Sequence, residues 1–247
     1  MYSTNEKKRF NTWLGSFYTR KWNDVESIIY FEKVFGGRQL LKRFNAESVD
    51  KNLIFHSSMV NENLSEQWIS SGWKEIAKLN VLSLNLRDIE VSNTITPNHE
   101  TFKESSINKL IDLDKNIFES YWQNSSAAFI ETIQSCPENY LFFTNQNDQN
   151  VGYAILGVNR KLGYLQRFGV HSEYQNKGLG KELLDKVLRF SKDKKLLNIR
   201  LNTQKENIFA QSLYTKNGFQ FTKTHYCIFG TSNTKYRNNE INEVGLI

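Results

Sequence analysis

The residues whose types and spacing best suit chemistry in this sequence form a glycine-containing loop ahead of a predicted helix. The loop follows a predicted strand over residues 164–170 and consists of Gln175, Asn176, Lys177, Gly178, Leu179, Gly180 and Lys181. The first N–H groups of a helix have no partner within it and lie at the positive end of its dipole. Glycine lets a ligand come close to the backbone. The pattern predicts an anion site, such as one for phosphate.

Two familiar phosphate-binding patterns do not fit this loop. No Gly-Lys-Ser/Thr follows it, as in a Walker loop, and the Gly-x-Gly-x-x-Gly spacing of dinucleotide sites is missing. A second motif lies downstream, where a short predicted helix ends at a glycine cap and enters a strand. Its residues are Asn207, Ala210, Leu213, Tyr214, Gly218 and Phe219. The order and spacing of the two motifs resemble the GNAT superfamily of acyl-CoA-dependent N-acyltransferases, most clearly over residues 150–225.

The resemblance implies that the loop N–H groups hold the pyrophosphate of acetyl-CoA. A strand containing Phe168, Gly169 and Val170 would diverge from its neighbour and bind the pantetheine arm through free backbone groups. One of these amides would polarise the thioester carbonyl. Asn207 would bond the same arm, and Tyr214 would be the general acid that protonates the departing thiolate. The alternative for Tyr214 is a purely structural ring packed against the sheet.

The base that deprotonates the amine is not evident in the sequence. One GNAT branch carries a glutamate five residues before the motif asparagine, and Asn202 occupies that position here. Because a carboxamide is not a base, Asn202 is kept only as a cofactor-site residue. The other candidates for the base or for acceptor contacts are Glu119, Gln166, Arg167, His171, Glu173, His225 and Tyr226. A water relay without a dedicated base also stays open.

Two neighbouring residues of the central strand bear on the acceptor. Strand alternation puts Gln166 and Arg167 on opposite faces, so one of them is expected to face the acceptor. Arg167 would suit an acceptor that carries a carboxylate, or it would form a structural ion pair.

The elements around these motifs alternate between strand and helix. Apolar spacing predicts helices over residues 107–118, from 180 onward and over 208–216. Strands are predicted over 140–143, 151–156, 164–170, 199–201 and 219–229, with a hairpin loop at 145–150. This order predicts an α/β fold. The resemblance implies a mixed, mostly antiparallel twisted sheet flanked by helices.

The N-terminal half contains a similar spacing. Asn61, Leu64, Gln67, Trp68, Gly72 and Trp73 repeat the arrangement of the Asn207 motif between two apolar segments. We interpret residues 1–91 as a smaller, degenerate or partial GNAT-like domain. Trp68 replaces the tyrosine, and Phe35-Gly36-Gly37-Arg38 has the wrong spacing for a phosphate loop. The prediction is one site per chain, in a catalytic domain over 92–232 that is followed by a flexible tail at 233–247.

Composition narrows the classes of function. The 247 residues carry 32 Lys and Arg against 26 Asp and Glu, a formal charge of +6 that is spread along the chain. No arginine-rich arm or nucleic-acid motif accompanies this charge, so nucleic-acid binding is the weakest hypothesis. A basic stretch from Lys177 to Lys195 is expected to be a solvated helix face. No apolar run is long enough for a membrane span, no leader is evident, and two cysteines cannot build a zinc site. The expectation is a cytoplasmic protein without metal.

The leading hypothesis is an N-acetyltransferase that moves an acetyl group from acetyl-CoA to a primary amine by direct attack in a ternary complex. A non-catalytic acyl-CoA sensor or scaffold is the alternative, favoured by Asn202. The acceptor stays open among protein N-termini, lysine, polyamines, aminoglycosides and amino acids, because a fold does not choose its substrate. Monomer and dimer are both open.

Overall fold

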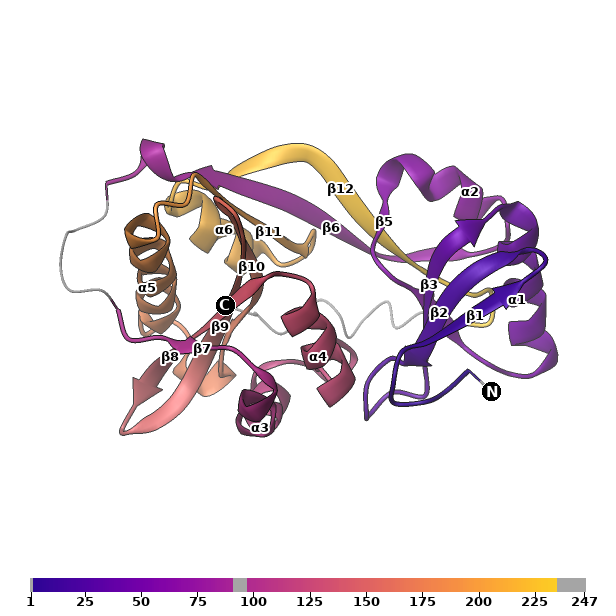
Figure 1. The fold of residues 1–247 in the computed structure, drawn as a ribbon, viewed down its shortest axis with the longest axis horizontal. Helices are drawn as coiled ribbons and strands as arrows, with labels where there is room; N and C mark the ends of the chain where they lie inside the picture. Colours follow the sequence, from indigo (N-terminus) through magenta and orange to yellow (C-terminus); the bar gives the residue numbers. More distant parts are fainter. Residues whose placement is uncertain (1, 91–96, 235–247) are drawn as a thin grey trace. The chain divides into compact units, whose positions relative to one another are not determined.

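The computed structural model describes residues 2–90 and 97–234 (Figure 1). The predicted domain boundary near residues 92–99 and the predicted tail lie largely outside these ranges. The chain forms two compact units: unit 1 holds the described residues up to Asn80 and from Lys223 onward, and unit 2 holds Val81–Thr222. Among the described residues, no helix is long and apolar enough to cross a membrane.

Unit 1 is built mainly from the N-terminal third of the chain. Its elements are β1 (Lys8–Thr12), β2 (Gly15–Lys21), β3 (Ile29–Gly36), α1 (Arg38–Asp50), β4 (Phe55–Ser57), β5 (Val60–Asn61), η1 (Glu62–Leu64), α2 (Ser65–Ile69) and the first part of β6 (Lys74–Asn85). Its core is aromatic and includes Phe17, Phe31, Phe44, Trp68 and Trp73.

Unit 2 follows the order predicted from the sequence and adds short elements to it. It begins with η2 (Leu86–Asp88), β7 (Glu100–Thr101), η3 (Glu104–Ser106), α3 (Ile107–Ile117), η4 (Ser120–Trp122) and α4 (Ser126–Gln134). It continues with β8 (Glu138–Gln146), β9 (Gln149–Asn159), β10 (Leu162–Val170), η5 (Ser172–Tyr174), α5 (Leu179–Asp193), β11 (Asn198–Gln204), α6 (Ile208–Lys216) and the start of β12 (Gln220–Gly230).

The hairpin loop predicted between β8 and β9 is tighter than expected. Only Asn147 and Asp148 separate the two strands, and both have positive φ angles, 49° and 60°. Positive φ at both central positions is typical of the two-residue hairpin turn whose twist matches that of the strands. Asparagine and aspartate tolerate this conformation, which explains why the polar run can turn so sharply.

The sheet of unit 2 is covered on both faces. Alternate residues of β9 point to opposite faces, with Ala154, Leu156 and Val158 in the cluster that contains α5 and α6. Tyr153 and Ile155 belong to the cluster that contains α3 and α4. The apolar positions of α5 explain its docking, since they lie on one stripe: Leu183, Leu184, Val187 and Leu188 are all buried.

Both units repeat one topology. The order β1-β2-β3-α1-β4-α2-β6 matches the order β8-β9-β10-α5-β11-α6-β12. The second and third strands of each series pair antiparallel, and the third and fourth pair parallel. The mixed, mostly antiparallel α/β fold predicted from the sequence is confirmed.

The last strand of each repeat passes from one unit to the other. β6 starts in unit 1 and ends in unit 2, whereas β12 starts in unit 2 and ends in unit 1. The full strand order is β1-β2-β3-β4-β12-β6-β11-β10-β9-β8-β7, with β5 beside β12. Leu82, Leu84 and Leu86 therefore lie in the core of unit 2. The compact units thus differ from the predicted domains, which were the contiguous ranges 1–91 and 92–232. The reason is that the last strand of each repeat ends in the compact unit of the other repeat.

Candidate active site

The loop between β10 and α5 adopts a conformation that the sequence makes accessible. Asn176 and Gly178 both have left-handed backbone angles, φ 59° and 84°, and Gly178 is the N-cap of α5. Upstream, the His171 ring caps η5 by accepting a hydrogen bond from the N–H of Glu173 (3.2 Å). The Gln175 side chain donates to the carbonyl of Val170 (3.0 Å) and so ties the loop back to the end of β10.

The loop carries a row of unused donors. The first backbone bond of α5 runs from the N–H of Glu182 to the carbonyl of Gly178 (3.0 Å). The six N–H groups before it, at residues 176–181, donate to no acceptor within the described ranges. A Cβ added at Gly178 would have no neighbour within 4 Å, so the space in front of the loop is open. Consecutive free N–H groups at a helix N-terminus form an anion site.

β10 and β11 part before either strand ends. Their parallel pairing runs from Leu162↔Asn198 to Leu165↔Leu201, and no pair joins residues 166–170 to β11. On its other side β10 stays paired with β9 as far as Val170. The sequence-based expectation of diverging strands is met, and the far part of β10 has one edge without a strand partner.

The register shows which backbone groups lie on that edge. The N–H of His171 donates to the carbonyl of Val151 (2.8 Å), so His171 and Val151 form a bonded pair. Bonded and non-bonded pairs alternate in an antiparallel ladder, so Gly169 also bonds to β9. The N–H and C=O groups of Phe168 and Val170 point the other way. The expected set of pantetheine contacts is thereby narrowed, because the polar groups of Gly169 are used within the sheet.

Gly169 has a different role in packing. A Cβ at this position would lie 2.5 Å from Ile117 and 2.8 Å from the ring of Phe118. Only glycine lets the C-terminal end of α3 approach β10 this closely, and this contact positions the segment that follows α3.

Tyr214 lies on α6 beside the unpaired part of β10. Its ring contacts the ring of Phe168 edge-on, with centroids 5.9 Å apart, and that of Phe219 at 5.6 Å. The side chain is 5% exposed, and burial raises the pKa of the phenol above its ordinary value. The hydroxyl makes no hydrogen bond to any residue that the structure describes. A phenol that stays protonated at neutral pH can donate a proton.

Asn202 and Asn207, both in the predicted site, differ in their settings. The Oδ1 atom of Asn207 accepts a hydrogen bond from the N–H of Ala210 (3.0 Å) and caps α6. Asn202 is exposed and follows Leu201, the last residue of β11 that pairs with β10. It therefore lies where the two strands part.

The prediction that Gln166 and Arg167 point to opposite faces of the strand is wrong. A bulge between Leu165 and Arg167 shifts the register, so both side chains point to the face covered by α3 and α4. Gln166 donates to Ser135 and to the carbonyl of Thr132 (3.4 Å) on α4. The bulge places an extra residue of β10 opposite β9. The prediction assumed strict alternation of side chains along the strand, and a bulge interrupts this alternation.

Arg167 forms the structural ion pair that was its alternative, with a buried partner, Asp114, that the sequence did not identify. Its Nε and Nη2 atoms donate to Oδ1 of Asp114 at 2.9 and 2.7 Å. The Tyr153 hydroxyl donates to the same oxygen. Burial raises the pKa of Tyr153 well above its ordinary value, so this phenol stays protonated. Asp114 sits between Leu110 and Ile117 on the apolar face of α3, and an acidic residue on such a face is the signal that could have revealed the pair.

The remaining candidate bases lie in structural settings. His171 caps η5, and Glu173 is exposed in that turn. Glu119 precedes η4 and accepts the N–H of Trp122 through its carbonyl (2.8 Å). His225 lies in unit 1, where its Nδ1 is 3.1 Å from the side chain of Asn80. Tyr226 also belongs to unit 1.

Three lysines of the basic stretch along α5 pair with acids, among them Lys194 with Glu138 at 2.5 Å. Lys181 contacts Asp185 at 2.6 Å, and Lys186 contacts Glu182 at 2.6 Å. Lys177, at the loop, lies over the ring of Tyr174 (5.1 Å to the centroid). These pairs favour the solvated helix face over a site for a polyanion.

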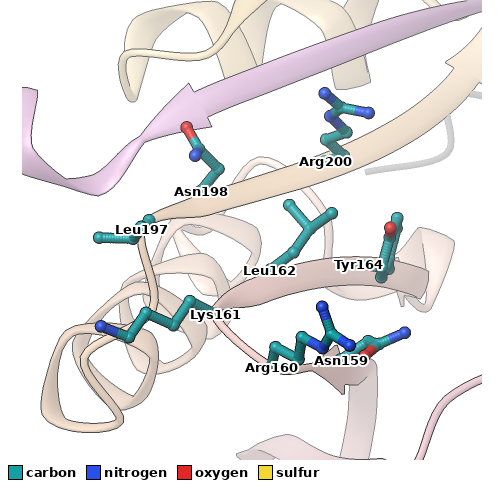
Figure 2. A pocket seen from close by; sticks show the side chains of 8 residues that line it. All are labelled: Asn159, Arg160, Lys161, Leu162, Tyr164, Leu197, Asn198 and Arg200. Atoms are coloured by element: carbon teal, nitrogen blue, oxygen red, sulfur yellow. The ribbon is translucent and has the colours of Figure 1, made fainter.

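A pocket of about 470 Å³ lies at the opposite end of β10 from the loop (Figure 2). Its lining residues are Asn159, Arg160, Lys161, Leu162, Tyr164, Leu197, Asn198 and Arg200. None of these belongs to the predicted site. The pocket is therefore distinct from the loop and the diverging strands.

Unit 1 repeats the geometry of the Asn207 motif. Asn61 caps η1 through the N–H of Asn63 (3.0 Å), as Asn207 caps α6. Gly72 and Gly218 end the two helices with φ 87° and 90°. The strand β3 also bulges, between Lys33 and Phe35.

The described residues of unit 1 do not repeat the loop and the tyrosine of the candidate acyl-CoA site. Only Gly37 separates β3 from α1, so there is no loop with free N–H groups like that before α5. Trp68 stands where unit 2 has Tyr214; it is 1% exposed and stacks on Phe229 at 5.5 Å. The candidate site therefore lies in unit 2.

Comparison with known proteins agrees with this geometry. Residues 107–219, which contain the loop and the Asn207 motif, match the model of the acetyltransferase (GNAT) family. The chain carries a GNAT domain. Within this GNAT domain, β10, the loop, α5, β11 and α6 form one continuous segment. A search of curated proteins finds no match.

Solved structures extend the fold likeness beyond the GNAT domain. The chain is similar to a GCN5-related N-acetyltransferase from Sphaerobacter thermophilus, with TM-score 0.60, 13% identity, and coverage of 88% of this chain and 76% of that one. It is also similar to a tandem GNAT protein from the clavulanic acid biosynthesis pathway, with TM-score 0.61, 12% identity, and coverage of 90% and 80%. The Kribbella flavida GCN5-related N-acetyltransferase gives TM-score 0.59, 10% identity, and coverage of 95% and 92%. These likenesses show the fold, and they include the N-terminal GNAT-like unit.

Proposed function

We propose that this protein transfers an acetyl group from acetyl-CoA to a primary amine, by direct attack within a ternary complex. The observation that carries the proposal is the row of six N–H groups at residues 176–181, around the N-terminus of α5, which have no acceptor among the described residues. This row lies next to an edge of β10 that β11 has left. A pyrophosphate fits the first feature, and an extended chain with amide groups fits the second.

Each part of the site then has a chemical role. The loop from Gln175 to Lys181 would bind the pyrophosphate, and the backbone groups of Phe168 and the N–H of Val170 would pair with the pantetheine arm. A free N–H on this edge would polarise the thioester carbonyl, where negative charge develops as the amine attacks. Asn202 and Asn207 would border the same arm.

Tyr214 would supply the proton that the departing thiolate needs. Burial keeps its hydroxyl protonated, and its position beside Phe168 puts it at the edge where the thioester would lie. The amine proton would leave through water, because the candidate bases His171 and Glu173 lie in a turn that they cap or border.

Two measurements test the proposal. Isothermal titration calorimetry with acetyl-CoA should show one molecule bound per chain, since unit 1 lacks the loop. Release of free CoA thiol should then be followed over a panel of amines. No binding at millimolar acetyl-CoA would contradict the proposal. Binding without thiol release from any amine would indicate an acyl-CoA sensor instead.

A further inference from the structure

One edge of the Arg167 guanidinium has no hydrogen-bond partner among the residues that the structure describes. Its Nε and Nη2 atoms make every hydrogen bond of the side chain: to Asp114, to the Tyr153 hydroxyl (3.3 Å) and to the carbonyl of Trp122 (2.7 Å). The Nη1 atom donates to no residue in the described ranges. The side chain keeps 14% of its surface exposed, so a ligand can reach it.

The protein holds this group rigidly. The guanidinium carbon lies 3.4 Å from the centroid of the Phe118 ring, so the group is stacked on that ring as well as hydrogen-bonded. The Asp114 carboxylate is completely buried and accepts the N–H of Asn124 (2.7 Å) with its other oxygen. Because three elements fix the guanidinium plane, a ligand on Nη1 would meet a donor that is already oriented.

The position of this donor relates it to the proposed reaction. Arg167 directly precedes Phe168, whose backbone groups lie on the free edge of β10. It points to the face covered by α3 and α4, whereas α5 and α6 cover the other face. Phe118, under the guanidinium, also packs on Gly169. Arg167 thus neighbours the reacting segment in the strand, and its side chain lies on the face opposite α5 and α6.

We infer that the acceptor is an amine that also carries a carboxylate, and that the carboxylate binds Nη1 of Arg167. This inference rests on the proposed acetyl transfer. Asp114 balances the charge of Arg167 on one edge, which leaves the positive end of the pair at Nη1. A carboxylate there makes a charge-assisted hydrogen bond, roughly twice as strong as a bond to a neutral oxygen. Lysine could not hold this geometry, because it lacks the planar fork.

Matched substrates test the inference on the intact chain. The common L-amino acids and β-alanine should be compared with their amides, which keep the amine and lose only the carboxylate charge. We expect kcat/KM to be about 10- to 100-fold higher for the acid of the best pair, the range given by one charged hydrogen bond. Arg167→Lys should abolish most of this ratio. Lys161→Gln, a charge change at the other end of β10, should preserve it.

The outcomes separate the inference from the proposed function. Equal kcat/KM for acids and amides, or turnover of uncharged amines only, would overturn the inference and leave acetyl transfer standing. Absence of CoA release with every amine would contradict acetyl transfer itself and remove the inference with it. If Arg167→Lys does not fold, the ratio of kcat/KM for acids to that for amides in the unaltered protein still tests whether the acceptor carries a carboxylate.

Discussion

The ring of Tyr214 lies edge-on against the ring of Phe168, with centroids 5.9 Å apart and planes at 66°. This contact joins α6 to the part of β10 that β11 no longer accompanies. The ring of Phe219 also contacts the tyrosine ring, with centroids 5.6 Å apart. These two contacts and the burial of the side chain restrict the ring beside the unpaired part of β10. Burial also raises its pKa, so the group is a donor rather than an acceptor of protons.

Tyr214→Phe should separate binding from chemistry. The variant keeps the ring contacts and loses only the proton donor, so the affinity for acetyl-CoA should be unchanged. We expect kcat to fall by about 10²- to 10⁴-fold, the usual contribution of a general acid. Steady-state kinetics at saturating amine measures this effect. Tyr164→Phe, on the other end of β10, is the matched control and should retain kcat. A Tyr214→Phe protein with full kcat would remove this residue from the mechanism.

The left-handed backbone at Gly178 should control cofactor affinity. Its φ of 84° disfavours residues with a branched Cβ, although a Cβ there would meet no atom within 4 Å. Gly178→Val should therefore act through backbone strain, which costs roughly 1–2 kcal/mol and distorts the row of N–H groups. Titration calorimetry should show acetyl-CoA binding weakened by about tenfold or more. Asparagine tolerates the left-handed region, so Gly178→Asn should bind acetyl-CoA more tightly than Gly178→Val. Equal affinities of the two variants for acetyl-CoA would show that the loop conformation does not control binding.

The site motifs could be predicted from the sequence because they are local. Gly178 and Asn176 mark a turn with positive φ, and the apolar stripe that follows marks a helix. Asn207 and Gly218 likewise mark the two ends of α6. In each case the signal lies within a few residues, and the structure places the elements where the patterns predict them.

Features that depend on distant partners were not predictable. The bulge at Gln166 arises from pairing with β9, and nothing in the residues 164–170 marks it. The Asp114–Arg167 pair joins α3 to β10, so neither residue shows its partner. The exchange of β6 and β12 depends on which distant strands each one pairs with, and the residues of the two strands do not show this. Sequence periodicity predicts which face of a strand is buried, but it does not predict which strand lies beside it.

Because of the strand exchange, truncating Leu84 should destabilise unit 2, although Leu84 belongs to the N-terminal repeat in the sequence. Leu84 precedes the expected domain boundary, yet it is 1% exposed in the core of unit 2. Leu84→Ala should destabilise unit 2 by about 2–5 kcal/mol through lost burial and a residual cavity. Thermal unfolding followed by circular dichroism, with and without acetyl-CoA, measures the effect. Leu64→Ala, at a position that is 51% exposed, should change stability by less than about 0.5 kcal/mol. Comparable melting of the two variants would contradict the exchange.

His56 predicts how the stability of unit 1 depends on pH. The ring is 4% exposed on β4, and burial lowers the pKa of His56 to about 3. Because the pKa in the folded state lies below the ordinary value of 6.5, protons bind the unfolded chain preferentially. The contribution of neutral His56 is therefore complete above about pH 6.5 and is lost progressively as the pH falls towards 3. At pH 5 the loss from this group should be about 2 kcal/mol.

Urea unfolding followed by tryptophan fluorescence reports on this unit, because the buried Trp68 and Trp73 lie in its core. The free energy of unfolding of the natural sequence should fall between pH 8 and pH 5. In His56→Gln the fall should be smaller by about 2 kcal/mol, because glutamine does not titrate. A variant that loses as much stability as the natural sequence over this range would show that His56 is not the group responsible. The Nε2 atom of His56 lies 3.5 Å from the hydroxyl of Thr234. Thr234→Val removes this contact and leaves the histidine able to titrate. This variant should therefore lower the free energy of unfolding by the same amount at pH 8 and pH 5.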